Sequence, residues 1–326
     1  MARWEILRGV NTLVQLCAGV KKGERALIVT DTRFPGHIPD FFALAVTALG
    51  AEPILIRMLT REHNGEEPPA PIAAAMKEVD VVFELSSVFV HHSEARQEAH
   101  RKGVRYLYLG GITDDLLAGP GAMGADFEAI APLVEKIARL ITTSEEIELT
   151  APGGTRFRAS LHGREGRALT GLARTPGSFG APPDIEAGVI PVEGTGEGTI
   201  VADAYAVELG LLSSPIQLEV EKGRVKTIKG PGTEAARLRR LLHAVANPNA
   251  YQIAEIGIGL NPCAEMIDNI LSAEGKAGTA HIALGTTPGD RDARLTRAGI
   301  HLDLVFWHPD ILLDGMPIIR HGEVII

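Results

Sequence analysis

The sequence predicts an α/β fold, with an N-terminal doubly wound domain built on a parallel sheet and a C-terminal mixed α+β domain. Up to about residue 140, short continuous apolar runs alternate with helical segments, as in proteins that bury a parallel sheet between helices. Beyond it, strand-like segments alternate apolar with polar residues and follow one another directly, which is typical of antiparallel hairpins. We therefore place the domains at residues 1–140 and 141–326.

The first domain is predicted to begin with a helix over residues 5–20, because Ile6, Val10 and Leu13 recur at helical spacing. The run 25–30 (R-A-L-I-V-T) predicts the first buried strand. Gly50 and Gly103 mark the ends of two later helices. The remaining strands are expected at 52–58, 79–85 and 104–109, and the remaining helices at 39–49, 72–78 and 93–102.

The second domain is expected to follow a linking helix over residues 126–140. Pro152-Gly153-Gly154 separates two alternating segments and predicts a hairpin. The other segments are strands at 198–206 and 216–228, a helix at 235–245 and short terminal strands at 311–313, 318–319 and 324–326. Residues 173–183, rich in Gly and Pro, are predicted to form a surface loop.

Composition limits the partners. The formal net charge is -9 and no long basic run is present, which argues against nucleic acid and an anionic membrane surface. Apolar runs such as residues 26–29 are too short to span a bilayer, and no signal peptide is recognisable. Cys17 and Cys263 are far apart in the sequence and form no disulfide framework, so we expect a cytoplasmic protein.

Two motifs are interpreted as structural. Residues 119–124 match G-x-G-x-x-G, but the motif follows a predicted helix and not a strand, so it does not predict a dinucleotide site. His91, His92 and His100 lie in or near a highly charged helical segment and are interpreted as a solvated helix surface.

Four polar residues of the C-terminal third stand inside apolar, strand-like segments. Burial of a carboxylate or imidazole is costly unless it is paired or bound to metal. On a strand, His301 and Asp303 point to the same side and offer a nitrogen and an oxygen ligand together. His308-Pro309-Asp310 repeats the His-x-Asp pattern, but its proline predicts a turn after the strand. The metal-site candidates are Glu255, His281, His301 and Asp303.

The motifs I-A-E-I-G-I-G-L-N-P, G-T-A-H-I-A-L-G and I-H-L-D-L-V, in this order, resemble those of the aminopeptidase T/leucyl aminopeptidase family of metalloaminopeptidases. The resemblance implies a homodimer with an enclosed cavity and a pair of Zn, Co or Mn ions in the C-terminal domain. It assigns Glu255, His281, His301 and Asp303 as ligands. Glu186 matches the first family glutamate and is expected to act as a ligand or a general base. The family tyrosine expected after H-I-A-L-G is absent.

The G-x-G-L-x-P and I-H-L-D patterns are also similar to those of the 2,5-dihydroxypyridine 5,6-dioxygenases, whose iron(II) is held by two histidines and an aspartate. Glu255 matches the first of those histidines. This resemblance implies that Glu255, His301 and Asp303 hold iron(II), with His281 acting beside them or as the acid/base.

The main functional hypothesis is a metal-dependent hydrolase of amide or peptide-like bonds, in which the metal generates hydroxide and polarises the carbonyl. Two anionic oxygens and one nitrogen suit zinc or manganese better than an iron that binds oxygen. The alternative is an iron(II) ring-cleaving dioxygenase, and a third hypothesis is a family member that only binds a small ligand. The expected partners are therefore a small-molecule or peptide substrate and a second copy of the chain.

Overall fold

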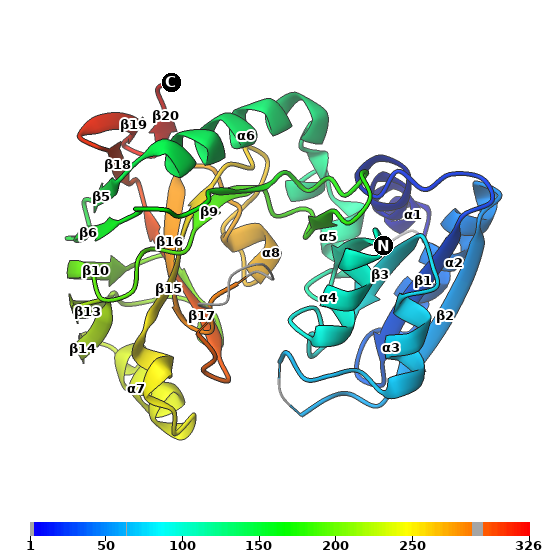
Figure 1. Ribbon diagram of the computed structural model, residues 1–326, viewed down its shortest axis with the longest axis horizontal. Coiled ribbons are helices and arrows are strands. Elements are labelled where there is room, and N and C mark those ends of the chain that lie inside the picture. Colours follow the sequence, from blue (N-terminus) through cyan, green and yellow to red (C-terminus); the bar gives the residue numbers. More distant parts are fainter. Residues whose placement is uncertain (1–2, 63, 289–295) are drawn as a thin grey trace. The chain divides into compact units, whose positions relative to one another are not determined.

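The structure is a computed structural model that describes residues 3–62, 64–288 and 296–326. Contacts between Cα atoms divide the chain into two compact units, Met1–Ala129 with Leu169–Pro183 and Ile130–Ala168 with Asp184–Ile326. A parallel sheet in the first unit and antiparallel pairing in the second confirm the predicted α/β fold class (Figure 1). A domain boundary at residue 140 stays a prediction.

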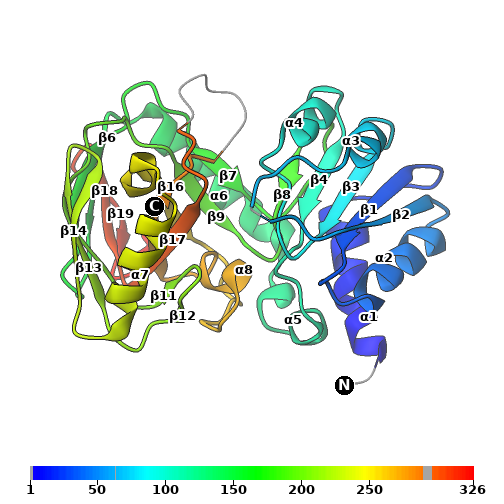
Figure 2. The same ribbon diagram turned by 90° about the horizontal axis from the view of Figure 1, so that it is seen from below.

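The first unit is built on a parallel sheet with strand order β2-β1-β3-β4-β8. Figure 2 shows α1 and α2 on one face of this sheet and α3 and α4 on the other, the doubly wound arrangement expected from the sequence. The strands are β1 (Arg25–Asp31), β2 (Glu52–Met58), β3 (Val81–Leu85), β4 (Arg105–Tyr108) and β8 (Phe179–Gly180). The helical segments are α1 (Arg3–Asn11), η1 (Thr12–Cys17), α2 (His37–Ala48), α3 (Ala70–Met76), α4 (Glu94–Arg101), α5 (Asp114–Ala118) and η2 (Ala122–Gly124).

The prediction of a surface loop over residues 173–183 is wrong. This segment carries β8, where Phe179 pairs in parallel with Tyr106 of β4. Ala173 is fully buried and Ala181 is nearly so. The strand pairing provides partners for backbone groups, which allows the segment to leave the surface. A strand of two residues is too short to show any periodicity, so the sequence carried no signal for it.

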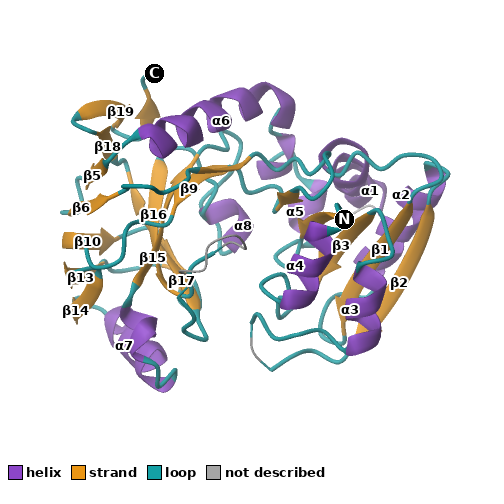
Figure 3. Ribbon diagram, viewed as in Figure 1, coloured by secondary structure: helices purple, strands orange, loops and turns teal. Residues whose placement is uncertain are grey.

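The second unit includes most of α6 (Phe127–Thr143) and otherwise consists mainly of strands (Figure 3). Its larger sheet has the order β14-β13-β10-β6-β5-β18-β19-β20, and its smaller sheet has the order β12-β11-β17-β16-β15-β9-β7. Strands of the larger sheet are β5 (Glu146–Thr150), β6 (Arg156–Ser160), β10 (Glu197–Ala202), β13 (Ile216–Glu221), β14 (Arg224–Lys229), β18 (Asp310–Leu313), β19 (Met316–Arg320) and β20 (Glu323–Val324). Strands of the smaller sheet are β7 (Arg167–Leu169), β9 (Glu186–Val189), β11 (Tyr205–Ala206), β12 (Gly210–Leu211), β15 (Ile253–Gly259), β16 (Thr279–Gly285) and β17 (His301–Trp307). The helical segments are α7 (Thr233–Ala244), η3 (Pro248–Tyr251) and α8 (Ile270–Ala273).

Strand β17 shows how the smaller sheet separates its apolar and polar side chains. Leu302, Leu304 and Phe306 are fully buried on one face, and β17 contacts β10 of the larger sheet. His301 and Asp303 alternate with them and therefore point to the opposite face. The apolar face stabilises the packed sheets, which leaves the other face of the same strands for polar side chains.

Several local predictions differ from the structure in detail. The helix expected over residues 5–20 is divided into α1 and a π-helical turn, η1. The strand expected over residues 198–206 is two strands in different sheets, β10 and β11. Gly119 follows α5 and not a strand, so the G-x-G-x-x-G match lies in the context expected of a structural motif. Within the described residues, no helix combines the length and apolar character that crossing a membrane requires.

Candidate metal centre

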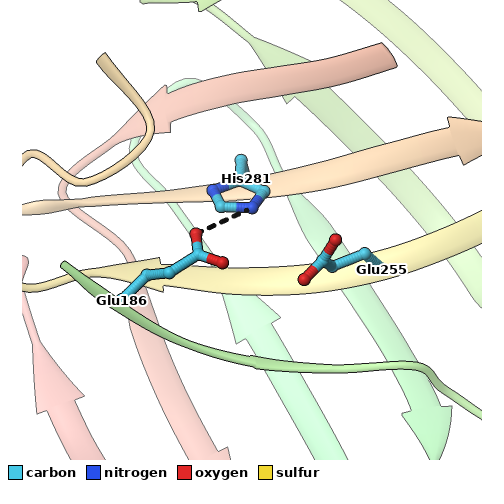
Figure 4. A group of neighbouring side chains, drawn as sticks. All are labelled: Glu186, Glu255 and His281. Carbon is cyan, nitrogen blue, oxygen red and sulfur yellow. Dashed lines mark ion pairs between the residues drawn. The ribbon is translucent and has the colours of Figure 1, made fainter. Parts of the chain in front are cut away.

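The predicted metal ligands all lie on one face of the smaller sheet. In the antiparallel register, Glu255 and Asp303 both pair with Ala283, and His301 pairs with Gly285. Directly paired residues share a face of the sheet, as do alternate residues along a strand. His281 alternates with Ala283 and Gly285 along β16, so its side chain belongs to the same face. Glu186 joins it from β9, where it pairs with Gly259 (Figure 4). The tertiary structure therefore brings together all five residues singled out in the sequence.

Two glycines on this face make room for the polar side chains. Gly257 pairs with His281, and a Cβ added at Gly257 would lie 2.1 Å from Nε2 of that ring. Gly188 pairs with Gly257 on the other side, and a Cβ there would lie 2.7 Å from Oε1 of Glu255. The glycine-rich pattern of β15 is thus explained by close approach of side chains across the sheet.

The first ligand group consists of Glu255, His301 and Asp303, whose ligand atoms all lie within 4.8 Å of one another. Nε2 of His301 is 3.3 Å from Oδ1 of Asp303 and 3.6 Å from Oε2 of Glu255. Nδ1 of the same ring is 2.7 Å from the carbonyl oxygen of Thr286. A proton on Nδ1 donated to this carbonyl leaves Nε2, beside the two carboxylates, as the nitrogen available to a metal ion, as in histidines that ligate metal.

The second ligand group consists of Glu186, Glu255 and His281. Nε2 of His281 is 3.4 Å from Oε2 of Glu186, the contact drawn in Figure 4. It is also 3.8 Å from Oδ1 of Asp303 in the first group. Nδ1 of His281 and Oε2 of Glu186 are buried and make no hydrogen bond within the described residues. Glu255 belongs to both groups, so the two sets of ligands are contiguous.

Arg167 of β7 is a site residue that the sequence analysis missed. Its Nη2 contacts Oε1 of Glu255 and lies 3.8 Å from Oε1 of Glu186. The guanidinium therefore faces the carboxylates of the second ligand group. In the sequence this arginine stands in the charged run G-R-E-G-R-A, where nothing distinguishes it from a surface residue.

Three further acidic or phenolic side chains border the same face. The pKa values of Asp184 and Glu274 lie well above the usual range because of desolvation and the neighbouring carboxylates. Protonated Glu274 donates a hydrogen bond to Asp303. Tyr205 of β11 pairs with Val305, which places it on this face, and burial raises its pKa. No motif linked these residues to the site.

The electrostatics are those expected of a site that holds a cation. Burial raises the pKa of Glu255, which Arg167 partly opposes, and burial together with Asp303 raises the pKa of Glu186 to about 7. Burial works against protonation of His301, but Asp303 and Glu255 outweigh it and raise the pKa of His301 to about 9. Burial lowers the pKa of His281, so this ring is neutral at neutral pH. The excess of carboxylates and the neutral imidazole fit a divalent cation.

The second His-x-Asp pattern lies outside both ligand groups. His308 follows the last residue of β17 and adopts a positive φ of 51°. Asp310 begins β18, where its Oδ1 accepts a hydrogen bond from the backbone N–H of His321 at 2.6 Å. The structure therefore places this pattern at the turn predicted from Pro309.

The first histidine of the group at residues 91–100 is not solvated as we expected. His91 is 7% exposed, and its ring centroid lies 4.2 Å from that of Tyr108. Its Nδ1 is 3.5 Å from Oε2 of the fully buried Glu84. His91 precedes α4, which begins at Glu94, so the charged helix pattern did not describe its surroundings.

The contiguous carboxylate–histidine ligand groups on one sheet face are the arrangement expected of a metalloenzyme. The family profile described as NicX, 2,5-dihydroxypyridine 5,6-dioxygenase, matches residues 5–326, and the chain belongs to this family. Family and ligand groups together confirm the prediction of a divalent metal cofactor, with iron(II) among the options.

Individual relatives agree with this family. A 2,5-dihydroxypyridine 5,6-dioxygenase of Pseudomonas putida is 26% identical over 196 residues, which cover 57% of this chain and 56% of the relative. The match thus spans little more than half of that relative's length. The structure of 2,5-dihydroxypyridine dioxygenase from P. putida KT2440 has the same fold, with a TM-score of 0.85, 20% identity and coverage of 100% of this chain and 98% of the other.

The aminopeptidase resemblance is seen in the fold. AmpT from Thermus thermophilus superposes with a TM-score of 0.71 at 17% identity, covering 99% of this chain and 100% of the other. At this identity the likeness shows the fold alone. The family match and the curated relative support an enzyme, and they favour the dioxygenase alternative over the hydrolase that was our main hypothesis. The ligand and catalytic roles of individual residues stay predictions.

Proposed function

We propose that this protein is an iron(II)-dependent dioxygenase that opens the ring of a dihydroxylated N-heteroaromatic compound of the 2,5-dihydroxypyridine type. Family membership over residues 5–326 supports the reaction type. The observation that carries the proposal is the His301 ring, whose Nδ1 is held by the Thr286 carbonyl while Nε2 faces Asp303 and Glu255.

In this proposal Glu255, His301 and Asp303 hold the metal, which when bound supplies coordination of the substrate oxygens and of dioxygen. The Thr286 carbonyl fixes the tautomer of His301 and Glu274 orients Asp303 by its hydrogen bond. These contacts preorganise the ligands before metal enters, which reduces the reorganisation that binding requires.

Proton transfer is assigned to His281 and Glu186, the two residues that belong to the second ligand group alone. Neutral His281 accepts a proton from a substrate hydroxyl at neutral pH, since its pKa is lowered by burial. Glu186, with a pKa of about 7 and an oxygen 3.4 Å from His281, takes up or returns that proton. A neutral imidazole beside a carboxyl group whose pKa is about 7 is suited to general acid–base catalysis.

The test is an assay of protein reconstituted anaerobically with iron(II) and then exposed to isotopically labelled oxygen. We expect loss of the ring absorbance of 2,5-dihydroxypyridine, uptake of one O₂ per ring and both labelled oxygen atoms in the ring-opened product. Aminoacyl amides serve as the second substrate panel, tested with zinc and manganese. Hydrolysis of these amides without oxygen uptake, together with an inert pyridine, would refute the proposal.

A metal-dependent amide hydrolase is the second candidate. It is favoured by the second ligand group, which shares Glu255 with the first as a bridging carboxylate does in a two-metal site, and by the fold likeness to AmpT. In both cases we propose a small substrate and association with a second copy of the chain.

A further inference from the structure

The two carboxylate oxygens of Glu255 face two different cationic positions. Oε2 lies 3.6 Å from Nε2 of His301, in the first ligand group. Oε1 is in contact with Nη2 of Arg167. Glu255 thus has the disposition of a carboxylate that bridges two metal ions, except that a guanidinium stands at the second position.

Arg167 is placed to neutralise the second ligand group. Its Nη2 contacts Oε1 of Glu255 and lies 3.8 Å from Oε1 of Glu186. The side chains of Glu255 and Glu186 are 4% and 6% exposed, so an unpaired negative charge on either would be costly. Arginine keeps its charge at every pH relevant to proteins, and therefore it provides a permanent cation.

The backbone next to Arg167 accommodates this contact. Gly188 of β9 has no side chain, and a Cβ there would lie 3.2 Å from Nη2 of Arg167 as well as 2.7 Å from Oε1 of Glu255. Any larger residue would therefore push the guanidinium and the carboxylate apart. The contact between Arg167 and Glu255 depends on a space in the sheet that only glycine leaves.

We infer that Arg167 takes the place of a second metal ion, so that the chain binds a single divalent cation at Glu255, His301 and Asp303. A second ion at Glu186, Glu255 and His281 would have to displace the guanidinium from Oε1 of Glu255 and remain beside its positive charge. The inference rests on the metal site of the proposed function, and it argues against the two-metal arrangement of the second candidate function.

The experiment measures how many manganese(II) ions the folded protein binds. Purified apoprotein is titrated with Mn²⁺ by calorimetry, and electron paramagnetic resonance distinguishes isolated ions from an exchange-coupled pair. We expect one isolated ion per wild-type chain. Arg167→Gln, which removes the charge, is expected to bind two ions with a coupled spectrum, whereas Arg167→Lys, which keeps the charge, is expected to bind one.

Arg164→Gln is the control, because Arg164 is likewise an arginine paired with a glutamate, Glu193, but lies outside either ligand group. It should bind one ion. Two coupled ions in the wild-type protein overturn the inference. This measurement on the wild type does not require that the Arg167 variants fold. A folded Arg167→Gln that still binds one ion also overturns it. Oxygen uptake is scored separately, so a single ion without dioxygenase activity would contradict the proposed function and leave this inference intact.

Discussion

Replacement of Gly257 by alanine tests the close packing of the site. The added Cβ would lie 2.1 Å from Cε1 and Nε2 of His281. Non-bonded carbon atoms keep about 3.5 Å, so the ring or the strand must shift by roughly 1.4 Å. Overpacking of this kind costs about 1–3 kcal/mol of the free energy of unfolding. A misplacement of about 1 Å in a catalytic group lowers the rate on the order of 100-fold.

The decisive assay is a double-mutant cycle on thermal stability. Gly257→Ala should lower the midpoint of unfolding by several degrees, at about 2–4 °C per kcal/mol for a domain of this size. In a His281→Ala background the clash is absent, and the same glycine substitution should cost much less. Metal binding, which we propose at Glu255, His301 and Asp303, should be retained in both backgrounds.

Gly124→Ala is the control, because the nearest atom to its added Cβ is 3.9 Å away and its φ is not positive. The predicted clash would be refuted by a Gly257→Ala protein as stable as the wild type. It would also be refuted by an equal cost of the substitution with and without the His281 ring, since that would place the clash elsewhere.

Two further predictions concern the metal ligands. His301→Ala should reduce the amount of bound metal about 10-fold or more, because it removes a nitrogen ligand. His308→Ala should bind as much metal as the wild type. Elemental analysis that finds equal metal in both variants would reject His301 as a ligand. In metal-free protein the pKa of His301 is raised from 6.5 to about 9 and that of Glu186 from 4.5 to about 7, so both groups bind more protons when folded. The contribution of Glu186 to the free energy of unfolding is complete below pH 4.5 and is lost as pH rises through 7. The contribution of His301 is complete below pH 6.5 and is lost as pH rises through 9. Stability of the apoprotein from these groups should therefore fall between pH 5 and 9, by on the order of 1–3 kcal/mol per group, as followed by urea unfolding. A His301→Gln variant should lose the part of this dependence above pH 7, and an unchanged curve would contradict the assignment.

The sequence determined the elements whose physical cause is local. Continuous apolar runs and alternating runs have different periods, and these periods separated the parallel sheet of the first unit from the antiparallel sheets of the second. Polar residues inside apolar strands identified Glu255, His281, His301 and Asp303, because a buried charge needs a partner. Pro309 separated the second His-x-Asp pattern from the first, and motif resemblance added Glu186.

The tertiary structure decided what depends on pairing between distant segments. Arg167 reaches Glu255 only because β7 lies beside β9 at the edge of the smaller sheet, an adjacency that no local pattern encodes. Tyr205 reaches the same face through the pairing of β11 with β17. Gly257 and His281 are opposed by the strand register, which a shift of one residue would abolish. Residues 169–183 belong to the first unit for a similar reason, because the edge of β4 provides backbone hydrogen-bond partners for them. The short Gly- and Pro-rich segment itself carries no pattern that predicts this pairing.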